Sequence, residues 1–394
     1  MSISFLIQYY LLFLHSNYIF FMRILYVTDA FAVWGGLERV LADKMNYLVE
    51  QYNYDVHLLT INQGTHDIPF FLNSAIGYQD LGIGMYRQYG YHGLVRLVIR
   101  QKIKRLLKQR MENVFFNLSP DIVVCVKFDF VGLLLKLKGS IPLVVESHTM
   151  CHSEEMDGSG LLRRIHVWSF KRNVSKVETV VSLTEGDADD WRHINTNVFV
   201  IPNIVHLSDS HQHAILKDRV VIYVGRFSSQ KDIQSLLSIW NRVNEKHPDW
   251  QLKIYGDGEL KDQYMPIIQG MDANIHVFPP TTAIMEKYFE SSILILTSLY
   301  EPFGLVLPEA MSCGLPVVAF DCPYGPADII TDGVDGFLIQ DRNVELFADK
   351  VCQLIEDEAL RKKMGKAGVL SSMRYSPDKI MPQWKTLFEN LVNS

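Results

Sequence analysis

Short apolar runs rich in β-branched residues alternate along the chain with longer segments, several of which show helical periodicity. Six such runs follow one another in the first half: RILYVT, YDVHLLT, DIVVCV, IPLVVE, VETVVSL and NVFVI. Apolar runs of this length, separated by amphipathic segments, predict strands of a parallel sheet joined by crossover helices. From Met22 onward, the first half of the chain therefore has the pattern of an α/β domain.

A second series of runs begins at residue 219 and comprises RVVIYV, QLKIY, ANIHVF, ILILT, LPVVAF and DGFLI. Between the two series, NIVHLSDSHQHAILKD is polar and has no clear period, so it is the best candidate for a domain boundary. We therefore expect two Rossmann-like, doubly wound α/β domains, at residues 22–204 and 205–375, facing each other across a central cleft. Such sheets bind ligands beyond the carboxyl ends of their strands.

Length and composition agree with this division. With 394 residues and 48% hydrophobic content, the chain can build two cores of ordinary size. Its five cysteines are scattered and show no CxxC or Cys/His spacing, which argues against a disulfide framework or a zinc site and fits a reducing cytoplasm. We expect each cysteine to be a small buried hydrophobe.

The first 21 residues, MSISFLIQYYLLFLHSNYIFF, are strongly apolar, but polar side chains such as Gln8 and Asn17 interrupt them and no Lys or Arg precedes Arg23. This makes residues 1–21 a poor signal peptide. Three interpretations stay open: an over-extended start site, which we favour because Met22 directly precedes the first strand; a membrane anchor or interfacial segment; and packed structure.

The formal net charge is −6, yet one segment is strongly basic. Residues 87–110 contain eight Lys and Arg residues, and no acidic residue occurs between Asp80 and Glu112. Apolar residues recur in this segment at near-helical spacing. It is either a cationic amphipathic helix that binds an anionic membrane or a phosphorylated partner, or a surface helix whose apolar stripe faces its own core. Nucleic acid is disfavoured, because the chain is acidic overall and no aromatic residue interleaves with the basic residues from Arg96 to Arg110.

Two cations follow the first strand of the second series. In VGRFSSQKD, Arg226 and Lys231 lie five positions apart. If the strand ends at Gly225 and a helix begins near Lys231 or Asp232, both cations and the helix N-terminus converge on one point. That combination favours a diphosphate, because the Arg guanidinium can contact two oxygens while Lys supplies a point charge. For this motif alone, solvated loop charges are the competing interpretation.

Two glutamates, Glu301 and Glu309, flank an apolar run in EPFGLVLPE. Pro302 keeps the residue before it extended, so Glu301 is placed in a strand-to-helix loop and Glu309 in the helix that follows. Eight residues at helical rise span about 12 Å, too far for both carboxylates to reach one anomeric carbon as the pair of a retaining glycosidase does. They can contact opposite ends of one long ligand, with backbone N–H groups facing phosphates between them. The pattern indicates a nucleotide diphosphate sugar.

Together these motifs resemble the retaining glycosyltransferases of family 4, which have the GT-B fold. In the C-terminal half the resemblance is carried by EPFGLVLPE, VGRFSSQKD and GLPVVAFDCPYGPADIITDGVDGFLI. In the N-terminal half it is carried by MRILYVTDAF, by the Gly-Gly loop of AVWGGLERV and by the His of LVVESHT. CPYGPADII is similar to members that extend bacterial surface polysaccharide, lipopolysaccharide or other lipid-linked oligosaccharide. Residues 376–394 resemble the family's C-terminal helix, which returns to the first domain.

The resemblance implies a role for each site residue. Arg226 and Lys231 would hold the donor diphosphate and stabilise the charge that develops on the leaving group. Glu301 would bind hydroxyls of the donor sugar and Glu309 those of the ribose. Backbone amides would contact sugar and phosphate at Phe303, Gly304 and Leu305, and the diphosphate from the other domain at Gly35 and Gly36.

His148 would lie beside the donor sugar and the reacting centre, although an ordinary hydrogen-bonded histidine is the competing interpretation of this residue alone. The catalytic set implied by the resemblance is therefore Glu301, His148, Arg226 and Lys231.

The reaction implied is transfer of a hexose-type unit, with retention, from an NDP-sugar, expected to be a UDP-sugar, to a hydroxyl of a glycan or lipid-linked glycan. No residue stands out as a covalent nucleophile, and the family suggests front-face attack in which the donor phosphate accepts the acceptor's proton. Since no DxD motif is evident, we expect neither a metal nor a cofactor. We expect a cytoplasmic protein, peripheral on the inner face of the cytoplasmic membrane if the basic segment docks there.

Other functions are less consistent with the sequence. A nicotinamide oxidoreductase is disfavoured, because DAFAVWGGLERV lacks GxGxxG. A non-catalytic sugar-nucleotide-binding subunit would keep the cations but lose Glu301, Glu309 or His148, all of which are present. A sugar-nucleotide epimerase of the same fold stays open, and it would form product without an acceptor. The sequence leaves open the sugar, the base, the acceptor, the linkage position and the oligomeric state.

Overall fold

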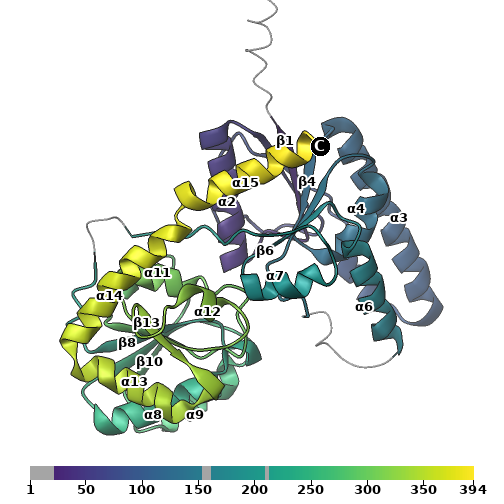
Figure 1. The fold of residues 1–394 in the computed structure, drawn as a ribbon. Helices are drawn as coiled ribbons and strands as arrows, with labels where there is room; N and C mark the ends of the chain where they lie inside the picture. Colours follow the sequence, from purple (N-terminus) through teal and green to yellow (C-terminus); the bar gives the residue numbers. More distant parts are fainter. Residues whose placement is uncertain (1–21, 153–160, 209–212) are drawn as a thin grey trace, which may run out of the picture.

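The computed structural model describes residues 22–152, 161–208 and 213–394, which form two lobes, each built on one parallel sheet flanked by helices (Figure 1). The apolar segment 1–21 lies outside the described residues. None of the helices in the described ranges is both long and apolar enough to cross a membrane.

The first lobe contains a seven-stranded sheet in the order β3-β2-β1-β4-β5-β6-β7, with all pairs parallel. Its strands are β1 (Arg23–Thr28), β2 (Asp55–Thr60), β3 (Gly77–Asp80), β4 (Ile122–Cys125), β5 (Leu143–Glu146), β6 (Thr179–Ser182) and β7 (Val198–Val200). All six predicted runs are strands. β3 was not predicted, because GYQD is a short, polar edge strand with no fully buried residue.

The second lobe contains a six-stranded parallel sheet in the order β10-β9-β8-β11-β12-β13. Its strands are β8 (Val220–Val224), β9 (Gln251–Tyr255), β10 (Ile275–Phe278), β11 (Ile293–Leu296), β12 (Val317–Phe320) and β13 (Gly336–Ile339). In both sheets the order reverses beside the first strand, between β1 and β4 and between β8 and β11. The carboxyl ends of the strands leave a crevice at such a point, which is where ligands bind in this class of sheet.

Helices cover both faces of each sheet (Figure 1). In the first lobe they are α2 (Gly36–Tyr52), α3 (Gly93–Leu118), α4 (Val131–Leu137), α6 (Leu161–Val174) and α7 (Glu185–Arg192). In the second they are α8 (Ile233–Lys246), α9 (Lys261–Gly270), α10 (Ile284–Phe289), α11 (Val306–Ser312), α12 (Gly325–Ile329), α13 (Val344–Glu356) and α14 (Glu358–Ser372). Because α2 follows β1 and α8 follows β8, both helices begin at the crevice of their sheet.

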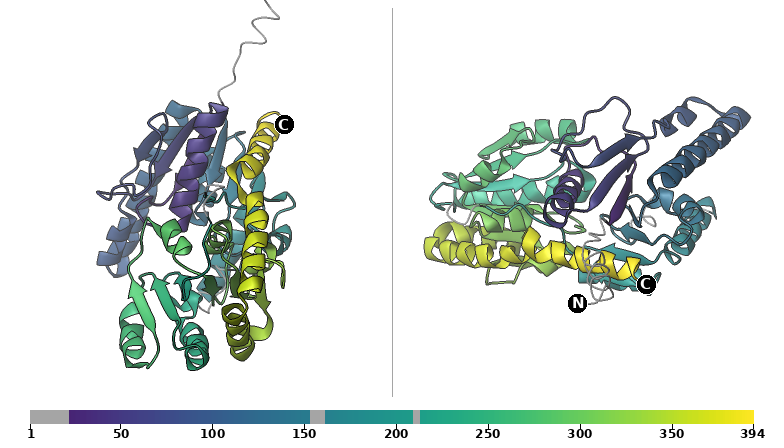
Figure 2. Two further views of the ribbon diagram at one scale, coloured as in Figure 1. Left: turned by 90° about the vertical axis from the view of Figure 1, so that its left-hand side faces the viewer. Right: turned by 90° about the horizontal axis from the view of Figure 1, so that it is seen from above.

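The last helix, α15 (Pro377–Val392), continues from the second lobe and lies against the first (Figures 1 and 2). Its apolar face is buried in the same core as β1 and α2, through Ile380, Met381, Trp384, Leu387 and Phe388. The chain thus passes between the lobes twice, once after β7 and once through α14 and α15.

The basic segment is helical, as a 3-10 turn (Met85–Gly90) followed by α3. The C-terminal half of α3 packs on the first lobe, where Leu107 and Met111 are buried, whereas the N-terminal half extends away from it (Figure 2). There Leu94 is 80% exposed and Leu97 56%. The expectation that the apolar stripe faces its own core therefore holds only for the second half of the helix. All five cysteines are buried thiols that take part in no disulfide.

Candidate active site

A cavity of about 430 Å³ lies between the lobes at the carboxyl ends of their strands. Five of the residues predicted for the site line it: Gly36 and His148 from the first lobe, and Arg226, Lys231 and Glu301 from the second. Residues far apart in the sequence therefore converge here. The second lobe lines the cavity with two cations and a carboxylate, and the first lobe lines it with an imidazole and a helix N-terminus.

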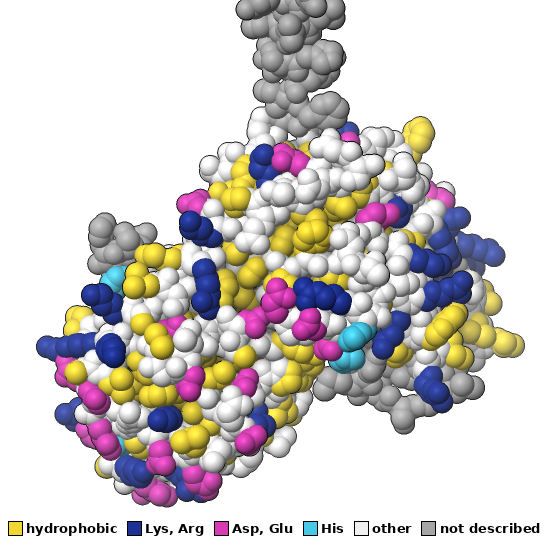
Figure 3. Space-filling view, viewed as in Figure 1, with side chains coloured by type: hydrophobic (Ala, Val, Ile, Leu, Met, Phe, Trp, Pro, Cys, Tyr) yellow, Lys and Arg dark blue, Asp and Glu magenta, His cyan; other side chains and the backbone are white. Residues whose placement is uncertain are grey.

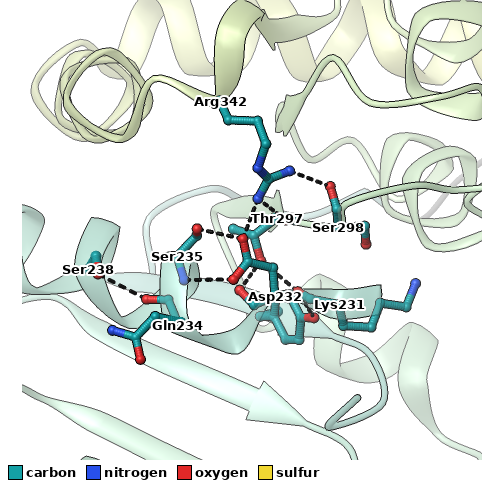
Figure 4. Close-up of polar contacts among 9 residues, drawn as sticks. Lys231, Asp232, Gln234, Ser235, Ser238, Thr297, Ser298 and Arg342 are labelled. Atoms are coloured by element: carbon teal, nitrogen blue, oxygen red, sulfur yellow. Dashed lines mark hydrogen bonds and ion pairs between the residues drawn. The ribbon is translucent and has the colours of Figure 1, made fainter. Parts of the chain in front are cut away.

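Lys231 is held by the turn that leads into α8. The turn Ser229–Lys231 is followed by Asp232, which caps α8 from a left-handed backbone conformation (φ 44°). The Asp232 carboxylate accepts from the Ser235 backbone N–H at 3.2 Å and from its hydroxyl at 2.6 Å (Figure 4). The hydroxyl of Thr297, just past β11, donates to the Lys231 carbonyl at 3.0 Å. The cation is thus fixed at a helix N-terminus, as the sequence predicted.

Arg342, which the sequence analysis did not single out, ties this turn to the end of β11. Its guanidinium donates to the carbonyls of Ser298 at 2.9 Å and Thr297 at 3.1 Å, and forms an ion pair with Asp232 (Figure 4). Arg342 therefore holds the loops after β8 and β11 in one arrangement. Lys231 and Glu301 belong to these two loops.

Glu301 is 5% exposed and forms an ion pair with Lys231. The Ser298 hydroxyl donates to the same carboxylate oxygen at 2.6 Å. Since Lys231 can only donate and the carboxylate can only accept, the pair presents a cation and an anion side by side to the cavity. The structure thus brings a group suited to phosphate next to one suited to sugar hydroxyls.

The CPYGP segment fixes the backbone of Glu301. The Glu301 N–H donates to the Pro323 carbonyl at 2.7 Å, while its own carbonyl accepts from Tyr324 at 3.0 Å and Gly325 at 2.8 Å. A Cβ atom on Gly325 would lie 1.9 Å from the Phe303 carbonyl oxygen, so only glycine fits this close approach. The CPYGP segment, which resembles surface-polysaccharide enzymes, therefore packs against the backbone of Glu301 and holds it in place.

The loop between the two glutamates approaches the first lobe closely. Within the described ranges, the backbone N–H groups of Phe303, Gly304 and Leu305 donate no hydrogen bond, but these three residues are outside the set that lines the cavity. The Phe303 side chain is buried in the second lobe, and a Cβ on Gly36 would lie 2.8 Å from the Leu305 side chain. Gly35 is the N-cap of α2 and is outside the set of residues that line the cavity.

Glu309 does not line this cavity but lies in the first turn of α11, 3% exposed. One carboxylate oxygen forms an ion pair with Arg39 of α2, in the opposite lobe, and the other accepts from the Tyr288 hydroxyl at 3.3 Å. Arg39 was not identified from the sequence, although it lies in the same Gly-Gly loop and helix motif. The structure thus separates the two glutamates, with Glu301 at the cavity and Glu309 at an interlobe contact.

His148 lies two residues beyond β5, and its ring lines the cavity. Its Nε2 is 3.0 Å from Oε1 of Glu146, the last residue of the strand. Another carboxyl group, Glu38 in the first turn of α2, interacts electrostatically with His148 and Arg226, and burial raises the pKa of Glu38. Neither glutamate was singled out from the sequence.

Tyr324 and α12 form a second contact between the lobes. The Tyr324 hydroxyl donates to Asp190 of α7, and the Glu185 N–H at the start of α7 donates to Asp328 at 2.9 Å. Together with the Arg39–Glu309 ion pair, these bonds connect the two lobes.

Comparisons with known proteins agree with this geometry. The family described as "Glycosyltransferase Family 4" matches residues 34–209, and that described as "Glycosyl transferases group 1" matches residues 208–370. The "Amylovoran biosynthesis glycosyltransferase AmsD" of Erwinia amylovora is 28% identical over 380 residues, which cover 93% of this chain and 99% of that protein. The "Poly(ribitol-phosphate) alpha-N-acetylglucosaminyltransferase" of Staphylococcus aureus is 30% identical over 244 residues, covering 61% of this chain and 49% of that protein.

Among solved structures, S. aureus TarM in complex with Fondaparinux, alpha-GlcNAc-glycerol and UDP superposes with a TM-score of 0.76, at 17% identity, covering 95% of this chain and 100% of that chain. The two-lobed architecture is thus the GT-B fold that the sequence predicted. Because the two family matches together span both lobes and meet at the boundary between them, the chain is a GT-B glycosyltransferase and belongs to the family that joins a Glycosyltransferase Family 4 domain to a Glycosyl transferases group 1 domain.

Proposed function

We propose that the protein transfers a sugar from an NDP-sugar, a UDP-sugar in particular, to a hydroxyl of a glycan or lipid-linked glycan in the assembly of a cell-surface polysaccharide. The observation that carries this proposal is the convergence of Arg226, Lys231 and Glu301 with Gly36 and His148 on one interlobe cavity. The names of the relatives, which include an amylovoran and a poly(ribitol-phosphate) glycosyltransferase, support the class of acceptor. The UDP in the TarM complex supports the donor.

In this proposal the diphosphate binds Arg226, Lys231 and the free N–H groups of residues 303–305. The donor sugar lies against Glu301 and His148, and Glu309 receives the ribose once Arg39 releases it. The bond between the anomeric carbon and the diphosphate oxygen breaks, the acceptor oxygen bonds to the same face, and its proton passes to a donor phosphate oxygen. Cations placed at the leaving group stabilise that transition state.

The decisive test uses a panel of UDP- and GDP-sugars. Calorimetry measures the binding of each donor, and the release of NDP measures its turnover. One donor that binds and is slowly hydrolysed, with transfer once a glycan acceptor is added, is the expected result. A product formed from the donor alone, without release of NDP, would identify an epimerase instead. Well-folded protein that binds no sugar nucleotide would contradict the proposal.

Metal independence is part of the same proposal, because Arg226 and Lys231 can supply the positive charge that a divalent cation supplies elsewhere. We expect turnover to be unchanged by EDTA. If EDTA abolished activity and Mn²⁺ or Mg²⁺ restored it, the positive charges of Arg226 and Lys231 would not be sufficient for catalysis.

We also propose that the 87–110 segment docks the first lobe on an anionic membrane, where a lipid-linked acceptor is presented. Basic side chains gather over α3, with exposed apolar side chains among them (Figure 3). Leu94, Leu97 and Val98 are each more than half exposed on the projecting half of the helix. Cations beside exposed apolar groups have the chemistry of an interfacial helix.

The test is co-sedimentation with phosphatidylglycerol vesicles after charge reversal at Arg100, Lys104 and Lys108. Binding should fall strongly, and it should also fall as salt is added. The matched control is charge reversal of three exposed lysines on α14: Lys362, Lys363 and Lys366. Equal vesicle binding by both variants would exclude α3 as the docking surface.

A further inference from the structure

A fully buried lysine lies behind the cavity, in the first lobe. Lys44 of α2 is 1% exposed and forms an ion pair with Oε2 of Glu146. Its ammonium also lies 3.9 Å from the ring centroid of Trp384 on α15 and 5.1 Å from that of Tyr26 on β1. Burying a charged pair costs several kcal/mol per ion, and apolar residues of similar volume often replace such pairs without loss of stability. Stability alone therefore does not account for a lysine at this position.

The partner of Lys44 connects it to the site. Glu146 binds Lys44 through Oε2 and His148 through Oε1, where the distance to Nε2 is 3.0 Å. Burial alone would raise the pKa of Glu146, but Lys44 and His148 lower it to about 2. The carboxylate is thus ionised at neutral pH and can only accept hydrogen bonds, so Nε2 of His148 carries a proton. When the ring is neutral, the other nitrogen, Nδ1, is left as an acceptor.

Charged groups from several elements surround His148. At the end of β5 it contacts Glu146, whose negative charge is balanced by Lys44 of α2. Glu38, in the first turn of α2, interacts with it from the same helix. Across the cavity it faces two cations and a carboxylate, Arg226, Lys231 and Glu301. Because Lys44 already balances the Glu146 carboxylate, His148 need only donate its Nε2–H to it.

We propose that Lys44 and Glu146 are positioning residues that hold His148 as the neutral Nε2–H tautomer, with Nδ1 accepting a hydrogen bond from a hydroxyl in the cavity. The inference rests on the proposed glycosyl transfer for the identity of that hydroxyl. The state of the ring, however, is a property of the protein without donor. α15 completes the arrangement, because Trp384 covers the ammonium from outside.

The first test reads the ring directly in the full-length protein. Long-range ¹H–¹⁵N correlation spectra of histidine-labelled protein at neutral pH, with His148 assigned from its absence in His148→Gln, should show a neutral Nε2–H ring. An imidazolium or an Nδ1–H ring in the wild-type protein would overturn the proposal, whatever any variant does.

Glu146→Gln supplies the second test. Lys44 can only donate, so the amide oxygen would turn to Lys44 and the amide NH₂ to Nε2, which then must accept. The ring should switch to the Nδ1–H tautomer. We expect kcat to fall about tenfold to a hundredfold, as for loss of the group that orients a ligating histidine, with UDP affinity unchanged. A switched ring with wild-type kcat would overturn the positioning role.

A matched control lies at the opposite, amino end of the strands of the same sheet. Glu178 accepts from Lys138, which is 8% exposed, at 2.7 Å, and it also accepts from the Leu143 N–H at the beginning of β5. Glu178→Gln therefore removes the charge of a comparable pair far from the cavity and should leave the His148 signals and kcat unchanged. If the wild-type protein has the predicted ring but turns over no NDP-sugar, glycosyl transfer is wrong and the assignment of the ring still stands.

Discussion

Lys231 stands between a carboxylate and the space proposed for the diphosphate. Without ligand it pairs with Glu301, and it lies at the N-terminus of α8, where backbone N–H groups also favour an anion. A bound diphosphate would give the ammonium a second anionic partner without moving it. Binding the leaving group and orienting the sugar-binding carboxylate are therefore coupled through one side chain.

For Lys231→Ala, we expect the affinity for UDP to fall roughly tenfold to a hundredfold, the value of one hydrogen bond to a charged group. Calorimetric titration with UDP measures it. The control is Lys246→Ala at the other end of α8, an exposed lysine paired with Asp349. Equal UDP affinities in the two variants would remove Lys231 from the donor site.

At the scale of residues, site side chains can be found in the sequence when they directly follow predicted strands. The carboxyl ends of parallel strands meet at one edge of the sheet, so these side chains are expected to lie close together. Arg226, Lys231 and His148 were found in this way. Arg39 and Arg342 were not, because each acts through a partner distant in the sequence; Arg342 and Asp232 are 110 residues apart. The residues next to such an arginine in the sequence do not distinguish it from an arginine that is exposed to solvent. The roles of all the site residues stay predictions.

At the scale of elements, the active-site loops are fixed by contacts between loops and helix ends. Arg342 joins the cap of α8 to the end of β11, and the CPYGP segment pairs with the backbone of Glu301. Both loops are thus rigid before any ligand binds. A preformed loop loses less conformational entropy on binding.

Arg342→Ala should lower the free energy of unfolding by about 1.5–3 kcal/mol, the usual cost of losing hydrogen bonds to a charged group. It should also weaken UDP binding, because the turn that holds Lys231 loses its anchor. Thermal denaturation and calorimetry measure the two effects. Arg219→Ala, which removes an exposed ion pair with Asp249 in the same lobe, should change neither. Loss of stability with unchanged UDP affinity would show that the loop keeps its shape without Arg342.

Strands and helices could be predicted from the sequence where burial requires apolar residues at fixed positions. Buried strands such as β4 and β11 read as continuous β-branched or leucine-rich runs, because both faces are covered. β3 was missed because an edge strand needs no such run. For α3 the sequence left two alternatives open, and the structure shows that the second half of the helix packs on the core while the first half projects.

For the whole molecule, the contacts between Arg39 and Glu309, and between Tyr324 and Asp190, connect the two lobes. In this arrangement Glu309 is 3% exposed, and its ion-pair partner comes from the opposite lobe. If the ribose is to reach it, as we propose, the ion pair must open first. Glu309 therefore helps to hold the lobes together in the unliganded protein, and in our proposal the ribose of the donor replaces Arg39 as its partner.

Arg39→Ala should shift the unliganded protein toward a more open arrangement. Removing one partner of a buried ion pair costs about 3–5 kcal/mol, and separation of the lobes would relieve much of that cost by returning Glu309 to water. Small-angle X-ray scattering should show a larger radius of gyration than for the wild type. Arg242→Ala, which breaks an exposed pair within the second lobe, is the control. Superimposable scattering curves for Arg39→Ala and the wild type would exclude the ion pair as an interlobe lock.

The position of α15 has a consequence for synthesis of the chain on the ribosome. β1 and α2 are translated before the second lobe, yet part of the surface that covers their core, including Trp384 and Phe388, is translated after it. The first lobe emerges as a domain that lacks one wall until α15 has left the exit tunnel. Domains otherwise tend to fold in the order in which they emerge. Here the second lobe can complete its core before the first does, so the earlier domain completes its fold only after α15 has been made.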